Sequence, residues 1–180
     1  MNKKALIIIL TLLALPILTI MPVEAGKGQE KLYYEANVVI PGYIPVNVRT
    51  VPPETTQANV VFMTASGTAT AFTLQIGSEV FYPNHLAEIQ VILNVAQNLV
   101  LLKISETYSF DGVDGTLEIS ATGRINNYGA PDAMSDVTVV GHGTGYFKGV
   151  KISAQGGNEP GDFTHKIHMG TIMGWPGLPP

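Results

Sequence analysis

Apolar and polar residues alternate with a period of two over long stretches of this chain, and this pattern constrains its fold most strongly. Between residues 32 and 40 every second position is apolar: Leu32, Tyr34, Ala36, Val38 and Ile40. Successive side chains of a β-strand point to opposite faces, so this spacing predicts a strand with one face in the core. The same alternation recurs over 68–76, 99–110 and 116–126, which predicts an all-β fold.

The segment 86–96 is the one stretch in which a helix competes with a strand. Leu86, Ile89 and Leu93 fall at spacings of three and four residues, as they would on one face of a helix. However, apolar residues also stand at every second position from Ile89 to Val95, and this stricter pattern favours a strand. With a short turn at 96–98, the chain then forms a long hairpin.

Eight or nine such segments follow one another at roughly regular spacing. This predicts a single antiparallel β-barrel of about eight strands over residues 26–180, with a β-sandwich as the alternative. Segments 59–64 and 68–76 are predicted to pair as a hairpin. The Pro-rich segment 41–54 is predicted to be a loop, or at best an edge strand, because proline lacks a backbone donor. The Pro- and Gly-rich tail, 174–180, cannot continue a strand.

Residues 1–25 have the three zones of a secretory signal peptide. Lys3 and Lys4 precede an apolar run over 5–21, and a short polar exit ends at Ala25. We therefore predict a signal-peptide helix that is cleaved after Ala25, and a secreted or extracytoplasmic protein. The alternative is an uncleaved N-terminal anchor, the one membrane contact that we expect. An apolar run of about 17 residues is at the short limit for spanning a bilayer.

Charge and cysteine content exclude several classes of protein. Removal of residues 1–25 takes away two Lys and one Glu, so the formal net charge moves from −4 to −5. A nucleic-acid-binding protein needs clustered Lys and Arg, whereas Arg49 and Arg124 are far apart in this sequence. Nucleic acid is therefore not an expected partner. The absence of Cys excludes a lipoprotein, and the core must stabilise the fold without disulfides.

Glycine recurs throughout the last third of the chain. The stretch TLEISATGRIN (116–126) is followed, after a polar loop, by SDVTVVGHGTGYFKGVKISAQGG (135–157). On physical grounds Gly149 and Gly156 predict bulges or close backbone approach at a barrel corner. The stretch also resembles the closing strands of the dirigent and allene oxide cyclase barrel superfamily. The matching residues are Val140, Gly141, Gly143, Thr144, Gly145, Phe147, Gly149 and Gly156.

This resemblance implies an eight-stranded barrel whose interior, in characterised relatives, encloses an apolar small molecule. The first half of the chain shows no match to the acidic pocket residues of dirigent proteins. No catalytic residue is therefore carried over from the family.

Glu106 is the polar residue with the most unexpected predicted position. It shares a strand face with Tyr108, so its carboxylate is predicted to point into the barrel, where an unpaired buried charge raises the pKa. Together with Tyr34 and His165 these residues would form a ligand-binding set in the lumen, able to orient or protonate a small molecule. The alternatives are a bulge near Ser105 that turns Glu106 outward, or a position in water at the barrel mouth.

His165 and His168 suggest a metal site, but residues three apart on a strand point to opposite faces. On the register that starts at Phe163, His165 lies on the core face and His168 on the other; a hydrogen-bonded core imidazole is the alternative role for His165. The segment 111–115 lacks the spaced acidic ligands of a calcium loop, and 141–145 lacks the lysine of a phosphate-binding loop. We expect no metal and no cofactor.

The sequence leaves three functions open, in this order. The first is a secreted protein that binds a small apolar molecule in the barrel lumen. The second is a cell-surface structural or interaction protein, with the segment 43–53 and Trp175 as contacts. The third is an enzyme, a cyclase or isomerase as the resemblance suggests, with proton transfer by Glu106 or His165. No nucleophile, base and orienting group stand out as a triad, and the oligomeric state is left open.

Overall fold

The computed structural model describes residues 30–50 and 60–179. Within these ranges the chain contains strands and two short 3-10 helices, η1 (Val95–Gln97) and η2 (Gly145–Phe147), and no α-helix. The strands are β1 (Lys31–Val39), β2 (Ile44–Thr50), β3 (Val60–Thr68), β4 (Ala71–Ile76), β5 (Glu79–Phe81), β6 (Asn84–Asn94), β7 (Leu99–Ser109), β8 (Thr116–Asn126), β9 (Ser135–Gly143), β10 (Lys151–Glu159) and β11 (Asp162–Met173). The all-β prediction is confirmed. The predicted signal peptide, 1–25, lies outside the described residues.

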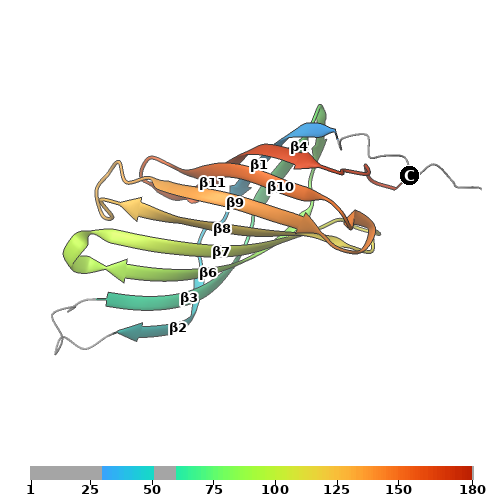
Figure 1. Cartoon of the computed structure of the whole chain (residues 1–180). Helices are drawn as coiled ribbons and strands as arrows, with labels where there is room; N and C mark the ends of the chain where they lie inside the picture. The colour runs from blue at the N-terminus through green and yellow to red at the C-terminus, as the bar shows by residue number, and fades with distance from the viewer. Residues whose placement is uncertain (1–29, 51–59, 180) are drawn as a thin grey trace, which may run out of the picture.

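All eleven strands belong to one antiparallel sheet, in the order β2-β3-β6-β7-β8-β9-β10-β11-β1-β4-β5. The sheet twists and curls into a half-barrel (Figure 1). The predicted closed barrel of about eight strands is wrong, because among the described strands β2 and β5 each pair on one side only. The Pro-rich segment 41–54 supplies β2, which agrees with the edge-strand alternative; its residues 51–54 lie outside the described ranges.

The hairpin of β6 and β7 supplies the third and fourth strands of the sheet, counted from the β2 edge. Its two strands of eleven residues pair without a register shift. At the turn, the Asn94 side chain accepts a hydrogen bond from the Gln97 N–H, and Asn98 adopts the left-handed conformation with φ 48°. The prediction of a strand in place of a helix over 86–96 is therefore confirmed for 86–94, whereas Val95 and Ala96 belong to η1.

The predicted hairpin of 59–64 and 68–76 is wrong. β3 continues through the expected turn and pairs with β2 and β6, whereas β4 pairs with β1 and β5. Gly67 lies inside β3, where a Cβ would come within 2.9 Å of the Ile40 side chain and 3.0 Å of the Tyr43 ring. This glycine therefore permits close packing and not a chain reversal.

Aromatic side chains fill the half-barrel at the end where β7 finishes. Phe110 lies near Phe147 and Trp175, and the rings of Phe147 and Trp175 stack with centroids 5.2 Å apart. Trp175 belongs to the Pro- and Gly-rich tail, so the tail folds back onto the domain. Trp175, which is predicted to contact another protein, packs instead against the core of its own chain.

Two glycines on the concave face let neighbouring strands approach closely. A Cβ on Gly123 in β8 would lie 1.9 Å from the Asp136 carbonyl oxygen, and one on Gly156 in β10 would lie 2.1 Å from the Ile167 carbonyl oxygen. No side chain fits at these separations, so both positions require glycine. The close backbone approach predicted for Gly149 and Gly156 is confirmed for Gly156 and wrong for Gly149, where no atom lies within 4 Å of a Cβ.

We predict that Gly156→Ala lowers the free energy of unfolding by about 1–3 kcal/mol, because the added methyl group must displace the β11 backbone. Urea unfolding measures the loss. Gly42→Ala is the matched control, since no atom lies within 4 Å of a Cβ at Gly42, and it should change stability by less than about 0.5 kcal/mol. Equal effects of the two substitutions would show that the close approach is unimportant.

Candidate functional site

The concave face of the half-barrel contains a cavity of about 350 Å³. Strand register builds its main wall, because the paired positions of β6 and β7 place three layers of aliphatic side chains on it: Leu93 with Val100, Val91 with Leu102, and Ile89 with Ile104. The other lining residues are Tyr43, Val61, Met63, Ile125, Tyr128, Ser135, Val137, Gly157, Asn158, Phe163, Lys166 and His168. The lining is mostly apolar, which suits an apolar molecule.

Tyr128 and Phe163 lie where the cavity reaches the surface. Tyr128 lines the cavity and is 46 % exposed, and its ring centroid is 6.1 Å from that of Phe163. Beside them Val100, Ile125 and Ala133 form a small buried cluster apart from the main core. A molecule that enters here meets an aromatic rim before the aliphatic wall.

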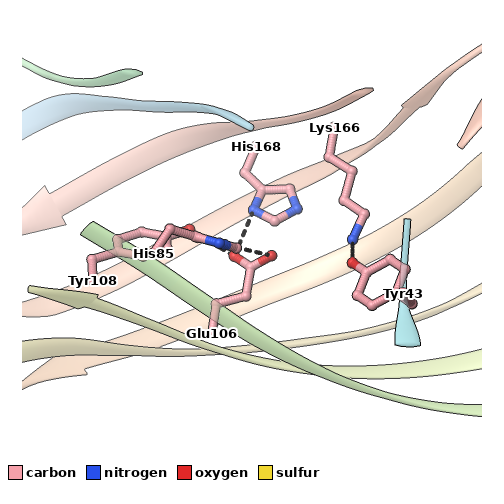
Figure 2. A network of polar contacts seen from close by, with 6 residues as sticks. All are labelled: Tyr43, His85, Glu106, Tyr108, Lys166 and His168. Atoms are coloured by element: carbon pink, nitrogen blue, oxygen red, sulfur yellow. Dashed lines mark hydrogen bonds and ion pairs between the residues drawn. The ribbon is translucent and has the colours of Figure 1, made fainter. Parts of the chain in front are cut away.

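Lys166 and His168 bring nitrogen groups to the cavity from β11. Residues two apart on a strand share a face, and both side chains line the cavity and are buried. The Lys166 Nζ donates a hydrogen bond to the Tyr43 hydroxyl and lies 4.5 Å from the centre of the Tyr43 ring (Figure 2). Burial lowers the pKa of Lys166 to about 8, so much of this side chain is a neutral amine near pH 8.

His168 also belongs to a buried polar cluster (Figure 2). We call it the Glu106 cluster, and its members are His85, Glu106, Tyr108 and His168. The Tyr108 hydroxyl donates a hydrogen bond of 2.7 Å to Glu106 Oε2. His85 Nε2 lies 3.7 Å from Glu106 Oε1, and His168 Nδ1 lies 3.8 Å from Glu106 Oε2. Register explains the first part of this grouping, since His85 pairs directly with Tyr108 and Glu106 shares their face.

The Glu106 cluster favours an ionised carboxylate beside neutral tyrosines. Burial raises the pKa of Glu106, but the contact with His85, the electrostatic interactions with His168 and His85, and the Tyr108 hydroxyl together lower it below its ordinary value. Burial lowers the pKa of His168 against the opposing effect of Glu106, and burial raises the pKa of Tyr108 and Tyr34. The raised pKa expected for Glu106 is therefore wrong, because its charge is not unpaired.

Several polar atoms here have no hydrogen-bond partner among the described residues. They are both ring nitrogens of His85 and of His168, and Glu106 Oε1. The His–Glu separations suit ion pairs but exceed hydrogen-bond lengths. Each unpaired buried polar atom costs about 1–3 kcal/mol. Of these residues His168 lines the cavity, so a ligand that forms a hydrogen bond with its ring would be stabilised. No group of three or more His, Asp or Glu side chains in the described ranges is arranged to hold a metal ion.

Three of the four residues predicted for the ligand-binding set come together. Tyr34, Glu106 and Tyr108 are buried and adjacent, although they lie beyond His168 and do not themselves line the cavity. The bulge near Ser105 is not found, since β7 pairs regularly with β6 and β8 through this position. A position in water is also wrong, because Glu106 is only 1 % exposed.

The core position predicted for His165 is wrong, and His168 occupies it. The pairing of β10 with β11 shifts register near the start of β11, so Phe163 and Lys166 both line the cavity although they are three residues apart. An alternation counted from Phe163 therefore assigns His165 to the wrong face. On the opposite face, His165 Nε2 lies 2.7 Å from Asn37 Oδ1.

His85 and Lys166 belong to the site but do not stand out in the sequence. His85 continues the buried face of Ala87 and Ile89, so extending the alternation of that strand toward its start would have found it. Lys166 gives no comparable signal, because a lysine in an alternating segment predicts an exposed side chain.

None of the family models, curated proteins and solved structures compared with the chain matches it. The resemblance of residues 116–156 to the dirigent and allene oxide cyclase barrel superfamily therefore stays a prediction. In the part of the chain that the structure describes, no helix is long and apolar enough to cross a membrane. The function must be inferred from the cavity and the Glu106 cluster.

We predict that stability increases by about 2 kcal/mol from pH 8 to pH 10 because of Lys166. Its folded pKa of about 8 lies below its unfolded value of about 10.4. Over this range the unfolded state binds more protons, so the free energy of unfolding rises with pH. Above about pH 10 the raised pKa values of Tyr34 and Tyr108 act in the opposite direction. Urea unfolding at each pH measures the slope.

Lys166→Met should remove this increase. Lys148→Met, a change at an exposed lysine, should preserve it and serves as the control. An increase that survives in Lys166→Met would assign the pH dependence to another group.

Proposed function

We propose that the protein binds a small apolar molecule in the cavity of its half-barrel. The observation that supports this proposal is the cavity, whose volume of about 350 Å³ lies within the range of roughly 300–1,000 Å³ typical of small-molecule sites. Three layers of aliphatic side chains from β6 and β7 form its wall. Transfer of apolar ligand surface from water to such a wall is favoured by about 25 cal/mol per Å².

The few polar groups on the cavity wall would orient the ligand. Such sites typically combine an apolar lining with a small number of convergent polar groups. Asn158 is engaged, since its side chain bonds to the backbone of Ser135 and Ala133. Lys166 and His168 keep bonding capacity toward the cavity.

The binding proposal predicts that the purified protein takes up N-phenyl-1-naphthylamine, an uncharged apolar dye that fluoresces more strongly in an apolar site. Val137→Phe should weaken dye binding at least about tenfold, because the larger ring occupies space in the cavity. Val140→Phe is the matched control, since Val140 lies on the same strand but is 55 % exposed. Fluorescence titration gives the affinities.

The proposal fails if the wild-type protein takes up no dye. It also fails if Val137→Phe remains folded, as urea unfolding would show, and binds the dye as the wild type does.

We also propose that the protein is exported, on the basis of residues 1–25. Mass spectrometry of the protein recovered from an extracytoplasmic fraction should find a chain that starts at Gly26. A recovered chain that still contains the apolar run would instead support the N-terminal anchor.

A second candidate function is acid–base catalysis on the bound molecule, and one observation favours it. His168 lines the cavity and also contacts Glu106, so its imidazole offers a route for a proton between a ligand and the buried carboxylate. The matching reaction class is isomerisation by proton transfer. A molecule extracted from the purified protein and returned to it in D₂O should gain deuterium with the wild type and not with Glu106→Gln.

A further inference from the structure

Lys166 occupies an unusual environment for a lysine. Its side chain faces the apolar cavity and is only 7 % exposed, and it forms none of the ion pairs in the described part of the chain. Its Nζ instead contacts the neutral hydroxyl of Tyr43. An ammonium group is poorly stabilised in such surroundings, whereas a neutral amine fits them.

A neutral amine that faces a ligand cavity can act as a nucleophile. Its lone pair attacks the carbonyl carbon of an aldehyde or ketone, and lysines are activated for this reaction when an apolar pocket removes their water. The reaction also needs groups that move protons at the nitrogen. The Tyr43 hydroxyl touches Nζ, and His168 extends from the same strand into the cavity beside Lys166 (Figure 2).

We propose that Lys166 forms a Schiff base with an apolar aldehyde or ketone bound in the cavity. This inference rests on the proposed function, which provides the binding site. The amine attacks the carbonyl carbon, the C–N bond forms as the C=O π bond breaks, and one of the two N–H protons moves from nitrogen to the carbonyl oxygen. The resulting carbinolamine transfers its remaining N–H proton to the departing oxygen, water leaves, and the nitrogen lone pair completes the C=N bond. One amine and one carbonyl compound give one imine and one water, and nothing is oxidised or reduced.

A neutral carbonyl compound suits this cavity better than an anion does. The Glu106 carboxylate lies on the other side of His168, and its charge opposes the entry of a second negative group. The chain also has a net negative formal charge, which does not attract anions. Lys166 would have to stay protonated to pair with a carboxylate, against the effect of its burial.

Decanal with sodium cyanoborohydride tests the proposal, because this reductant converts an imine to a stable secondary amine. Intact-mass and peptide mass spectrometry of the wild-type protein should find one decyl group at Lys166, added at least about tenfold faster than at the exposed Lys148. Lys166→Met should lose the fast addition, and Lys148→Met should keep it. Removal of a buried amine is not expected to impair folding, and urea unfolding verifies this.

A protection experiment on the wild-type protein needs no variant. N-phenyl-1-naphthylamine should slow the addition of decanal at Lys166 and leave addition at Lys148 unchanged. Decanoate should protect Lys166 no better than decanol does. Stronger protection by decanoate would overturn the proposal and assign Lys166 to an anionic ligand.

The dye separates failure of this inference from failure of the proposed function. If the dye binds and decanal displaces it, but Lys166 is labelled no faster than Lys148, the Schiff base is wrong and the cavity still binds apolar molecules. If neither the dye nor decanal enters the cavity, the proposed function fails and the inference fails with it.

Discussion

The fold depends on how the charge of Glu106 is accommodated inside the half-barrel. Glu106 and Tyr108 come from β7, His85 from β6 and His168 from β11. In the sheet order β8, β9 and β10 separate β7 from β11, yet His168 Nδ1 lies 3.8 Å from Glu106 Oε2. The sheet must therefore curl through three strands to bring the imidazole to the carboxylate. Without that curl Glu106 would lose one of its compensating partners, and an uncompensated buried charge is strongly destabilising.

The same curl divides the concave face into a hollow zone and a solid zone. Along β7, the side chains of Val100, Leu102 and Ile104 line the cavity, whereas Phe110 just beyond the strand belongs to the packed aromatic end. Glu106 and Tyr108 lie between the two zones on the same face. Of the Glu106 cluster, His168 is the member that lines the cavity, and the Glu106 carboxylate 3.8 Å from its Nδ1 attracts the imidazole electrostatically to the place where a bound molecule would meet it.

Alternation predicts this structure well where strand pairing is regular and poorly where it is not. The segment 116–126 is β8 with the same bounds, and the inward direction of Glu106 follows from its regular strand. Alternation counted from Phe163 places His165 on the wrong face because a register shift at the start of β11 reverses the faces. In the sequence Gly67 resembles a turn residue, but it lies inside a strand, where it packs closely against the sequence-distant side chains of Ile40 and Tyr43. Closure of a barrel depends on strand number, tilt and stagger, which alternation does not encode. Lys166 is buried because other residues pack around the cavity that it faces, and alternation does not encode this packing either.

The unclosed sheet also affects how molecules of this protein meet one another. As an edge strand, β2 exposes Ile44, Val46 and Val48, and an apolar edge promotes strand pairing between molecules. Pro45 has no backbone donor, and the pairing of β2 with β3 is irregular between Pro45 and Asn47. The strand therefore presents an interrupted row of donors to a second molecule. A substitution that restores a backbone donor at position 45 would remove one of these interruptions, and an exposed apolar edge strand with fewer interruptions is a stronger template for aggregation.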